Sequence, residues 1–332
     1  MKSLAIIGGG SWGTALAIVL APRFADVRLW VYEADLASRM QQTRENDVYL
    51  RGFQVPGNVR ILNELPAALT GADVILSVVP SHLVRALYEQ MLPSLRPDMV
   101  FVSATKGLEN STLLRSSEII SQVVSPRFAP QVAVLSGPSF AREVAGLSPT
   151  VIVVSSPDPA VATRVQTAFS SASLRLYTSS DPIGVEIGGS IKNVVAIGAG
   201  VLDGLGLGHN TVAALITRGL AEMTRLAVAL GGQARTLSGL AGLGDLVLTC
   251  TGELSRNRTV GVQLAQGRKL DEIVQSMRMV AEGIKTTSAA VELARRHSVE
   301  MPIAEQMYQM LHHGLDPREA VRRLMERSLK GE

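Results

Sequence analysis

Short apolar segments alternate with helix-like patterns along the first 179 residues of the chain. In the helix-like patterns the apolar side chains recur every three or four positions, as they do on one face of a helix. Strands that alternate with helices are typical of a mostly parallel sheet that helices cover on both faces. We therefore expect a doubly wound α/β sheet over residues 1–179. Its strands are predicted at residues 4–7, 27–31, 59–62, 74–79, 99–102, 132–135, 151–154 and 174–177.

The strand-like segments end near residue 180, and the rest of the chain is patterned as helices alone. The change falls at the string SSDP, which begins at Ser179 and in which polar residues precede a proline suited to the first turn of a helix. We expect a second, all-helical domain over residues 180–332. Its helices are predicted at residues 183–202, 210–230, 257–266, 284–297, 302–312 and 317–328.

The letters GGGSWG, which begin at Gly8, fit the pattern G-x-G-x-x-G and stand between a predicted strand and a helical pattern at residues 14–20. In a dinucleotide-binding turn, Gly8 would make the tight turn, Gly10 would let a pyrophosphate approach the backbone, and Gly13 would pack the helix against the strand. The helix N-terminus would face the phosphates. The sequence thus predicts a Rossmann domain that binds NAD or NADP. A structural turn without a ligand is the alternative.

Glu33 follows the second predicted strand, 20 residues after Gly13. An acidic side chain at this place can accept hydrogen bonds from the adenosine ribose and would repel the 2′-phosphate of NADP. This favours NAD as the cofactor and leaves NADP possible. Alternatively, Glu33 only begins the next helix, where an acid suits the helix dipole.

Two further loops follow predicted strands at the edge where open α/β sheets bind ligands. Lys106 comes after the strand at residues 99–102, and the string SGPSFA, which begins at Ser136, comes after the strand at residues 132–135. Either loop can be an ordinary connection. Beside a dinucleotide-binding turn, the two together indicate a ligand site.

Lys192 and Asn193 are polar residues inside an otherwise apolar helical pattern. The same pattern contains Gly188 and Gly189, and a glycine inside a helix costs roughly 1 kcal/mol relative to alanine, which indicates that another group approaches this backbone closely. Lys192 is therefore a candidate functional residue. A lysine whose ammonium group reaches solvent is the alternative.

Asp245 is the one acid in a string of glycines and leucines, GLAGLGDL. A buried carboxylate needs a cation or several hydrogen-bond donors, so Asp245 is expected to pair with a cation such as Lys192. An N-cap aspartate at the start of the next helix is the alternative. Nearby, the arginines of the string SRNR at residues 255–258 can bind phosphate with two hydrogen bonds, unless they belong to a solvated turn.

Composition narrows the expected surroundings and partners. At 332 residues the chain is longer than a single core usually serves, which agrees with two domains. Its 32 basic and 29 acidic residues leave a net charge of +3, and the basic residues are scattered, so nucleic acid is not an expected partner. Cys250 is the only cysteine, which excludes an internal disulfide and favours a reducing cytoplasm.

No leader, membrane span or metal site is expected from the sequence. The apolar run Leu4–Ile7 is too short for a signal peptide, and no uninterrupted apolar stretch approaches the length of a membrane span, so membrane insertion is not expected. The five histidines lack metal-ligand spacing.

Seven motifs stand in order along nearly the whole chain. They are GGGSWGTALA at residues 8–17, N-x-x-Y-L at 46–50, SATKGLE at 103–109, SGPSFAREV at 136–144, EIGGSIKNVVAI at 186–197, GLAGLGDL at 239–246 and SRNR at 255–258. In this set and order they resemble the NAD(P)-dependent glycerol-3-phosphate dehydrogenases of glycerophospholipid synthesis. So many ordered motifs are specific to that family rather than to Rossmann proteins in general.

The resemblance implies that the protein interconverts sn-glycerol 3-phosphate and dihydroxyacetone phosphate. It implies Lys192 as the acid and base for the substrate's secondary hydroxyl, with Lys106, Asn193 and Asp245 completing the catalytic site. A lysine can act as a base when burial and a neighbouring cation lower its pKa from about 10.4. Implied substrate contacts are Lys106, Gly137, Ser139, Lys192, Asp245, Ser255, Arg256 and Asn257. Beside the turn glycines Gly8, Gly10 and Gly13, implied cofactor contacts are Ser11, Trp12, Tyr32, Glu33, Tyr49, Lys106, Ala141, Arg256, Val280 and Glu282.

Two positions depart from the pattern of many bacterial relatives. The first is around residues 32 and 33, where many of those relatives have a basic residue and this chain has Tyr32 and Glu33, which puts the use of NADP in doubt. The second is Arg51, which replaces a proline for a reason that we cannot explain. We expect a homodimer built on the helical domain. Two alternatives stay open: a related Rossmann and helical dehydrogenase of a different hydroxyacid or phosphate, and a non-catalytic, dinucleotide-binding redox sensor.

Overall fold

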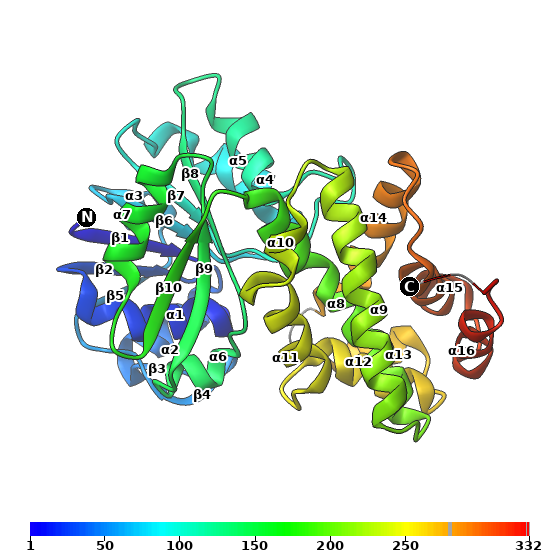
Figure 1. Cartoon of the computed structure of the whole chain (residues 1–332). Helices are drawn as coiled ribbons and strands as arrows, with labels where there is room; N and C mark the ends of the chain where they lie inside the picture. The colour runs from blue at the N-terminus through cyan, green and yellow to red at the C-terminus, as the bar shows by residue number, and fades with distance from the viewer. Residues whose placement is uncertain (278–280, 330, 332) are drawn as a thin grey trace. The chain divides into compact units, whose positions relative to one another are not determined.

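The computed structural model describes residues 1–277, 281–329 and 331 of the chain. The chain forms two compact units (Figure 1). Unit 1 comprises Met1–Lys106 and Leu114–Glu186, and unit 2 comprises Gly107–Leu113 and Ile187–Glu332. Gly107–Leu113 therefore belongs to unit 2, although β7 Val100–Ser103 before it and α5 Ser116–Val124 after it both belong to unit 1.

Unit 1 contains an eight-stranded sheet in the order β10-β9-β8-β7-β6-β1-β2-β5. Neighbouring strands are parallel, except that β8 and β9 are antiparallel. Every apolar segment of the first half is a strand whose ends lie within two residues of the prediction, so the doubly wound Rossmann fold is confirmed. The strands are β1 Ser3–Ile7, β2 Asp26–Trp30, β5 Val59–Leu62, β6 Val74–Ser77, β7 Val100–Ser103, β8 Gln131–Ser136, β9 Thr150–Ser155 and β10 Leu174–Ser179.

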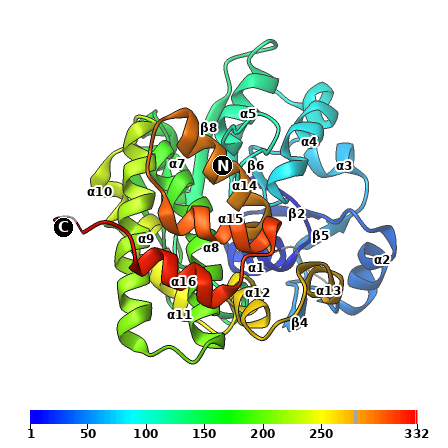
Figure 2. The same ribbon diagram turned by 90° about the vertical axis from the view of Figure 1, so that its right-hand side faces the viewer.

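The sheet is buried on both faces, because successive side chains of a strand point to opposite sides. In β1, Leu4 belongs to one hydrophobic cluster and Ala5 to another. The first cluster contains side chains of α1 Ser11–Leu20, α2 Ala34–Thr43 and α7 Pro159–Phe169. The second contains side chains of α3 Leu65–Leu69, α4 Val84–Met91 and α5 Ser116–Val124. Figure 1 and Figure 2 show these helices around the sheet, and burial on both faces explains why the strands are apolar runs.

A separate antiparallel pair, β3 Glu45–Asn46 and β4 Leu50–Gln54, was not predicted. β3 is too short to show an alternating pattern, and three of the five residues of β4 are exposed, so neither strand gives an apolar signal. The pair follows α2 in the sequence, and the turn between its strands carries Tyr49.

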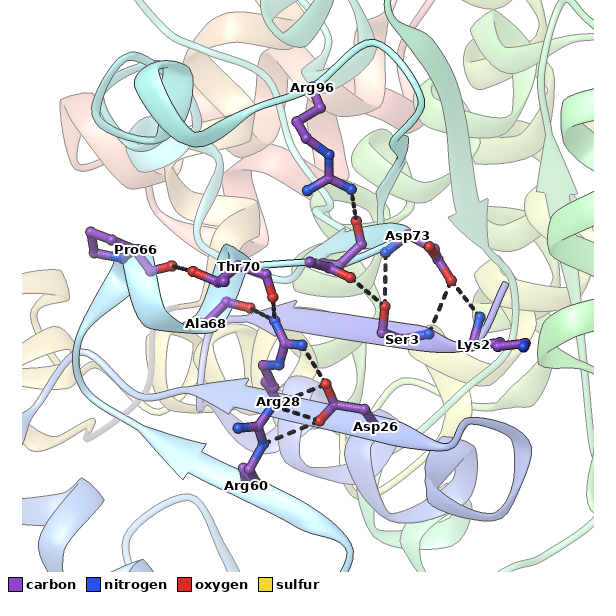
Figure 3. A network of polar contacts seen from close by, with 12 residues as sticks. Lys2, Ser3, Asp26, Arg28, Arg60, Pro66, Ala68, Thr70, Asp73 and Arg96 are labelled. Atoms are coloured by element: carbon purple, nitrogen blue, oxygen red, sulfur yellow. Dashed lines mark hydrogen bonds and ion pairs between the residues drawn. The ribbon is translucent and has the colours of Figure 1, made fainter.

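A polar network ties together the strands at the amino edge of the sheet (Figure 3). The guanidinium of Arg28 in β2 is buried, donates to the backbone oxygens of Ala68 and Thr70, and forms an ion pair with Asp26. Arg60 of β5 binds the same carboxylate at 2.9 Å. The network joins backbone and side chains of unit 1 at the edge opposite to the one where open α/β sheets bind ligands, so we interpret it as structural.

Unit 2 contains most of α8 and all later helices. Predicted helices of the second half all exist and begin within two residues of their predicted starts. α10, α11 and α13 were not predicted, because helices of four to seven residues are too short to show an apolar period. The helices are α8 Pro182–Gly204, α9 His209–Ala229, α10 Ala234–Leu237, a π-helical turn Leu240–Gly244, α11 Asp245–Thr251, α12 Arg256–Ala265, α13 Leu270–Ser276, α14 Glu282–Arg296, α15 Pro302–His313 and α16 Pro317–Met325.

α8 is a core helix. Among the described residues it is the one helix long and apolar enough to cross a membrane by length and composition, but its most apolar window is entirely buried inside the protein. The close approach expected at Gly188 and Gly189 is observed at Gly188, where a Cβ would lie 2.4 Å from the backbone oxygen of Ala241. A further close approach, which was not predicted, is at Gly200, where a Cβ would lie 1.9 Å from the backbone oxygen of Arg258. Larger residues are thus excluded where α8 packs against other segments of unit 2.

Candidate active site

The glycine turn after β1 has the geometry of a phosphate-binding turn. Gly8 has a φ of +125°, and a Cβ there would lie 2.3 Å from the backbone oxygen of Val78. A Cβ at Gly13 would lie 1.9 Å from the backbone oxygen of Gly8. By contrast, a Cβ at Gly10 would meet nothing within 4 Å. Gly8 and Gly13 are therefore required by packing, whereas Gly10 leaves open space beside the start of α1.

The N-terminus of α1 fits a bound anion. Its N-cap residue, Gly10, provides no side-chain hydrogen bond, and the first turn contains no acid. Backbone N–H groups at a helix start are suited to phosphate oxygens. In addition, the indole Nε1 of Trp12 is buried and makes no hydrogen bond within the described part of the chain. An uncapped helix start and a buried donor without an acceptor are what a dinucleotide pyrophosphate would satisfy, so the residues present fit the cofactor.

Glu33 lies just beyond the carboxyl end of β2, at the N-cap position of α2. Glu33 therefore does stand at a helix start, as the alternative expected, but its carboxylate makes no capping hydrogen bond to α2. Instead its Oε1 accepts a hydrogen bond of 2.6 Å from the hydroxyl of Tyr49. This hydrogen bond, together with burial, raises the pKa of Tyr49 to about 12. Tyr32 is 76% exposed, with its ring edge-on to that of Trp30.

Lys106, Gly137 and Ser139 come together at the carboxyl ends of β7 and β8. The Lys106 Nζ donates to the backbone oxygen of Gly137 at 3.4 Å, and the Ser139 hydroxyl donates to the same oxygen at 2.9 Å. Gly137 has a φ of +138°, and a Cβ there would lie 3.0 Å from the Cα of Ile152. α6, Ala141–Ala145, begins directly after this loop. Both strand-end loops singled out in the sequence thus meet in unit 1.

In unit 2, Lys192 of α8 and Asp245 of α11 form a buried ion pair. The Lys192 side chain also donates to the hydroxyl of Thr249 at 2.9 Å, and that hydroxyl donates to the backbone oxygen of Asp245 at 2.6 Å. Lys192 is only 4% exposed and Asp245 is fully buried. The alternative that the Lys192 ammonium group reaches solvent is therefore wrong. The alternative that Asp245 is an N-cap residue is also wrong, because Gly244 is the N-cap residue of α11 and Asp245 is its first helical residue.

A second chain of hydrogen bonds joins α8, α12 and α14. The Asn257 Nδ2 donates to the Oδ1 of Asn193 at 3.0 Å, and the Asn257 Oδ1 accepts from the backbone N–H of Gly283 at 2.9 Å. A Cβ at Gly283 would lie 2.6 Å from the backbone oxygen of Asn193, so only glycine fits. Within the described residues, the second N–H of the Asn257 amide makes no hydrogen bond, so it can donate to a ligand.

Arg256 is the first residue of α12, after the N-cap residue Ser255. Burial lowers the pKa of Arg256, and the charge of Glu282 opposes this effect. The hydroxyl of Ser255 accepts from the backbone N–H of Arg258 at 3.3 Å, which leaves its hydrogen for another acceptor. The predicted phosphate-binding residues therefore do stand at a helix start, and Glu282, predicted at the cofactor, lies near Arg256.

Sequence reasoning missed Thr249 and Gly283. Thr249 follows Asp245 by four residues, which places both on one face of a helix, but the short α11 itself was not predicted. Gly283 gives no signal, because its role comes from a contact with a distant segment. Val280, predicted at the cofactor, lies outside the described residues. Among the residues described, no three His, Cys, Asp or Glu side chains gather to hold a metal ion.

A Rossmann sheet with an open glycine turn, followed by a helical unit with a buried lysine and aspartate, defines an NAD(P)-dependent dehydrogenase. Residues 3–162 match the family model of the NAD-dependent glycerol-3-phosphate dehydrogenase N-terminus, and residues 181–322 match that of its C-terminus. The chain is 56% identical over 329 residues to glycerol-3-phosphate dehydrogenase [NAD(P)+] of Koribacter versatilis, with 98% of each chain covered. It is 54% identical over 331 residues to that of Geobacter sulfurreducens, with 100% of this chain and 99% of the relative covered.

The solved structures agree with these relatives. The crystal structure of glycerol-3-phosphate dehydrogenase from Coxiella burnetii matches with a TM-score of 0.93 and 42% identity, over 98% of this chain and 99% of the other. The protein therefore belongs to the NAD-dependent glycerol-3-phosphate dehydrogenase family, and the resemblance found in the sequence is confirmed.

Proposed function

We propose that the protein interconverts sn-glycerol 3-phosphate and dihydroxyacetone phosphate with NAD(P), using Lys192 as the acid and base. The buried cluster of Lys192, Asp245 and Thr249 is the observation that carries the proposal. When bound, the reduced nicotinamide supplies a hydride to the substrate's carbonyl carbon. Unit 1 is then the cofactor domain and unit 2 the substrate domain.

Lys192 donates the proton that balances the reaction. During reduction the carbonyl oxygen gains negative charge, and an ammonium group beside it stabilises this charge and transfers a proton. Asp245 and Thr249 hold the Lys192 Nζ in one place, since each has a fixed position on α11. In the oxidising direction the neutral amine accepts the hydroxyl proton. Asn193 follows Lys192 on α8 and is fixed by Asn257.

The phosphate end of the substrate is assigned to the start of α12. Arg256 offers a planar guanidinium, Ser255 a hydroxyl and Asn257 its remaining amide N–H. An arginine fork matches phosphate geometry, and a helix start adds backbone donors. In unit 1, Lys106, Gly137 and Ser139 are assigned to the substrate as well, because they meet at the carboxyl edge of the sheet.

The cofactor is assigned to the glycine turn with Ser11, Trp12, Tyr32, Glu33, Tyr49 and Ala141 in unit 1, and to Arg256 and Glu282 in unit 2. Glu33 favours NAD, because an acid accepts hydrogen bonds from ribose hydroxyls and repels a 2′-phosphate. We further propose a cytoplasmic homodimer that supplies glycerophospholipid synthesis. Its single cysteine, Cys250, is buried and unpaired, and unit 2 exposes apolar side chains such as Val228 and Met325. Light scattering of the purified protein tests the dimer.

The decisive experiment compares dihydroxyacetone phosphate with dihydroxyacetone as substrates, followed by the loss of NADH absorbance. We expect rapid oxidation of NADH with the phosphorylated ketone and at least a hundredfold lower kcat/KM with dihydroxyacetone, because that ketone lacks the hydrogen bonds assigned to the phosphate. Equal turnover of both ketones would favour a dehydrogenase of another substrate. If no small phosphate in a panel supported oxidation of NADH, the interpretation as a non-catalytic redox sensor would be favoured.

A further inference from the structure

The N-x-x-Y motif at residues 46–49 links the glycine turn to Glu33 through side-chain hydrogen bonds, and the proposed function assigns Tyr49 only as a cofactor contact. Asn46 of β3 is fully buried. Its Nδ2 donates to the backbone oxygen of Gly9 and to the hydroxyl of Thr14, each at 2.8 Å. Its Oδ1 accepts from the backbone N–H of Tyr49 at 2.9 Å. Asn46 thus uses both amide hydrogens and its oxygen, and it holds the backbone of Tyr49 against the glycine turn.

The Tyr49 side chain continues this chain of contacts to Glu33. Its ring packs against the hydrophobic cluster that covers one face of the sheet, and its hydroxyl donates to the Glu33 Oε1 at 2.6 Å. The Tyr49 hydroxyl is protonated at neutral pH and is a donor, and the Glu33 carboxylate raises the pKa of Tyr49 further, to about 12. Within the described residues, the second oxygen of Glu33, Oε2, accepts no hydrogen bond. One carboxylate oxygen is therefore fixed by the protein and the other is left for a ligand.

The charges around Glu33 and Tyr49 disfavour binding of the 2′-phosphate of NADP. Asp35 contributes a negative charge beside Tyr49. The nearby cation Arg39 is engaged by two acids, Asp35 at 2.9 Å and Asp47 at 3.1 Å. A 2′-phosphate would therefore face the carboxylates of Glu33 and Asp35, whereas ribose hydroxyls would donate hydrogen bonds to Glu33.

We infer that Tyr49 is a positioning residue that fixes the Glu33 carboxylate for the adenosine ribose, and that this pair sets the preference for NAD over NADP. The inference rests on the proposed function only in assigning Glu33 to the cofactor. A carboxylate held by a phenol loses less side-chain freedom when it binds the ribose, so the hydrogen bond increases affinity for NADH without contacting the nicotinamide.

Fluorescence titration with NADH and with NADPH tests this inference without any substrate. The proteins are the wild type, Tyr49→Phe, Glu33→Ala and the double variant, with Tyr177→Phe on β10 as a matched control. We expect the wild type to bind NADH more tightly than NADPH. In Tyr49→Phe, NADH affinity should fall roughly threefold to tenfold, the net size of one ordinary hydrogen bond, while NADPH affinity changes less than twofold. Tyr177→Phe should match the wild type.

The double variant separates positioning from packing. If Tyr49 acts through Glu33, Tyr49→Phe should change NADH affinity less than twofold in the Glu33→Ala background, which has no acceptor for the Tyr49 hydroxyl. An equal loss in both backgrounds, or an equal loss for NADH and NADPH, would overturn the inference. So would a wild type that binds the two cofactors equally. Melting temperatures within about 2 °C of the wild type would confirm that the variants are folded. Failure to reduce dihydroxyacetone phosphate would contradict the proposed function alone, because the titrations do not depend on turnover.

Discussion

The two groups of charged residues assigned to the reaction differ in their access to water. In unit 2, Lys192 and Asp245 are 4% and 0% exposed, whereas in unit 1 Glu33 and Tyr49 are both partly exposed. Charges interact strongly where water is excluded and weakly where it is not. The buried pair is therefore suited to proton transfer, which needs a strong electrostatic interaction. The half-exposed pair is suited to choosing between two cofactors, which needs only a small difference in binding free energy.

The largest effect on stability is expected where the buried pair is broken. Asp245→Ala would leave the Lys192 ammonium buried without its carboxylate, so the free energy of unfolding should fall by about 3–5 kcal/mol. The double variant Lys192→Met with Asp245→Ala removes both charges and should regain most of that loss. Urea unfolding measures both values. If the double variant is no more stable than the single one, the cost comes from packing and the charge argument is wrong.

Glu222 of α9 sharpens the comparison, because it is a buried acid of unit 2 that pairs with backbone N–H groups instead of with a lysine. It accepts from Ile303 at 2.7 Å and from Ala304 at 3.2 Å, at the start of α15. Burial raises the pKa of Glu222 from 4.5 to about 7, and these two hydrogen bonds only partly oppose the rise. The folded protein therefore binds this proton more tightly than the unfolded chain does.

A raised carboxyl pKa gives stability that is complete below about pH 4.5 and is lost as the pH rises through about 7. Between pH 5 and pH 8, Glu222 should therefore lower the free energy of unfolding by roughly 2–3 kcal/mol. In Glu222→Gln this contribution disappears, because the amide does not titrate. Urea unfolding of both proteins at these two pH values measures the difference. Parallel pH dependence of the two proteins would show that Glu222 keeps its ordinary pKa.

The smallest effect is expected at the half-exposed pair. Glu33→Ala should narrow the ratio of kcat/KM for NADH over NADPH by about tenfold, because it removes both the ribose contact and the repulsion of the 2′-phosphate. Initial rates with dihydroxyacetone phosphate measure the ratio. Glu89→Ala, which removes an exposed acid of α4, should leave it unchanged. An unchanged ratio in Glu33→Ala would mean that this edge of the sheet does not select the cofactor.

The sequence predicts the parts of this molecule that repeat a local pattern. Strands such as β1 are buried on both faces and appear as apolar runs, and α8 shows its apolar period over its whole length. Gly8 was predicted because its turn follows a strand directly. Tertiary contacts were harder to predict from the sequence. The pairing of Lys192 with Asp245 was expected from the cost of burying a charge, but nothing in the string around residue 245 revealed the short helix α11.

The residues that escaped prediction act through contacts that are distant in the sequence. Thr249 binds Lys192, 57 residues away. The motif letters of Asn46 and Tyr49 were visible, but their contacts to Gly9 and Glu33 depend on the short pair of β3 and β4, which has no apolar signal. Local patterns therefore give the fold and the candidate residues, whereas the partners of those residues require the structure.

The central claim is that Lys192 is the proton donor for the carbonyl oxygen. Its most direct test measures the rate of dihydroxyacetone phosphate reduction by Lys192→Met at saturating NADH, with NADH affinity determined on the same sample. Lys269→Ala, which removes an exposed lysine of unit 2, is the control. The account predicts NADH affinity within about twofold of the wild type and a rate lower by roughly a hundredfold to ten-thousandfold, the range of general acid catalysis. A variant that binds NADH and turns over at a rate near that of the wild type would contradict it.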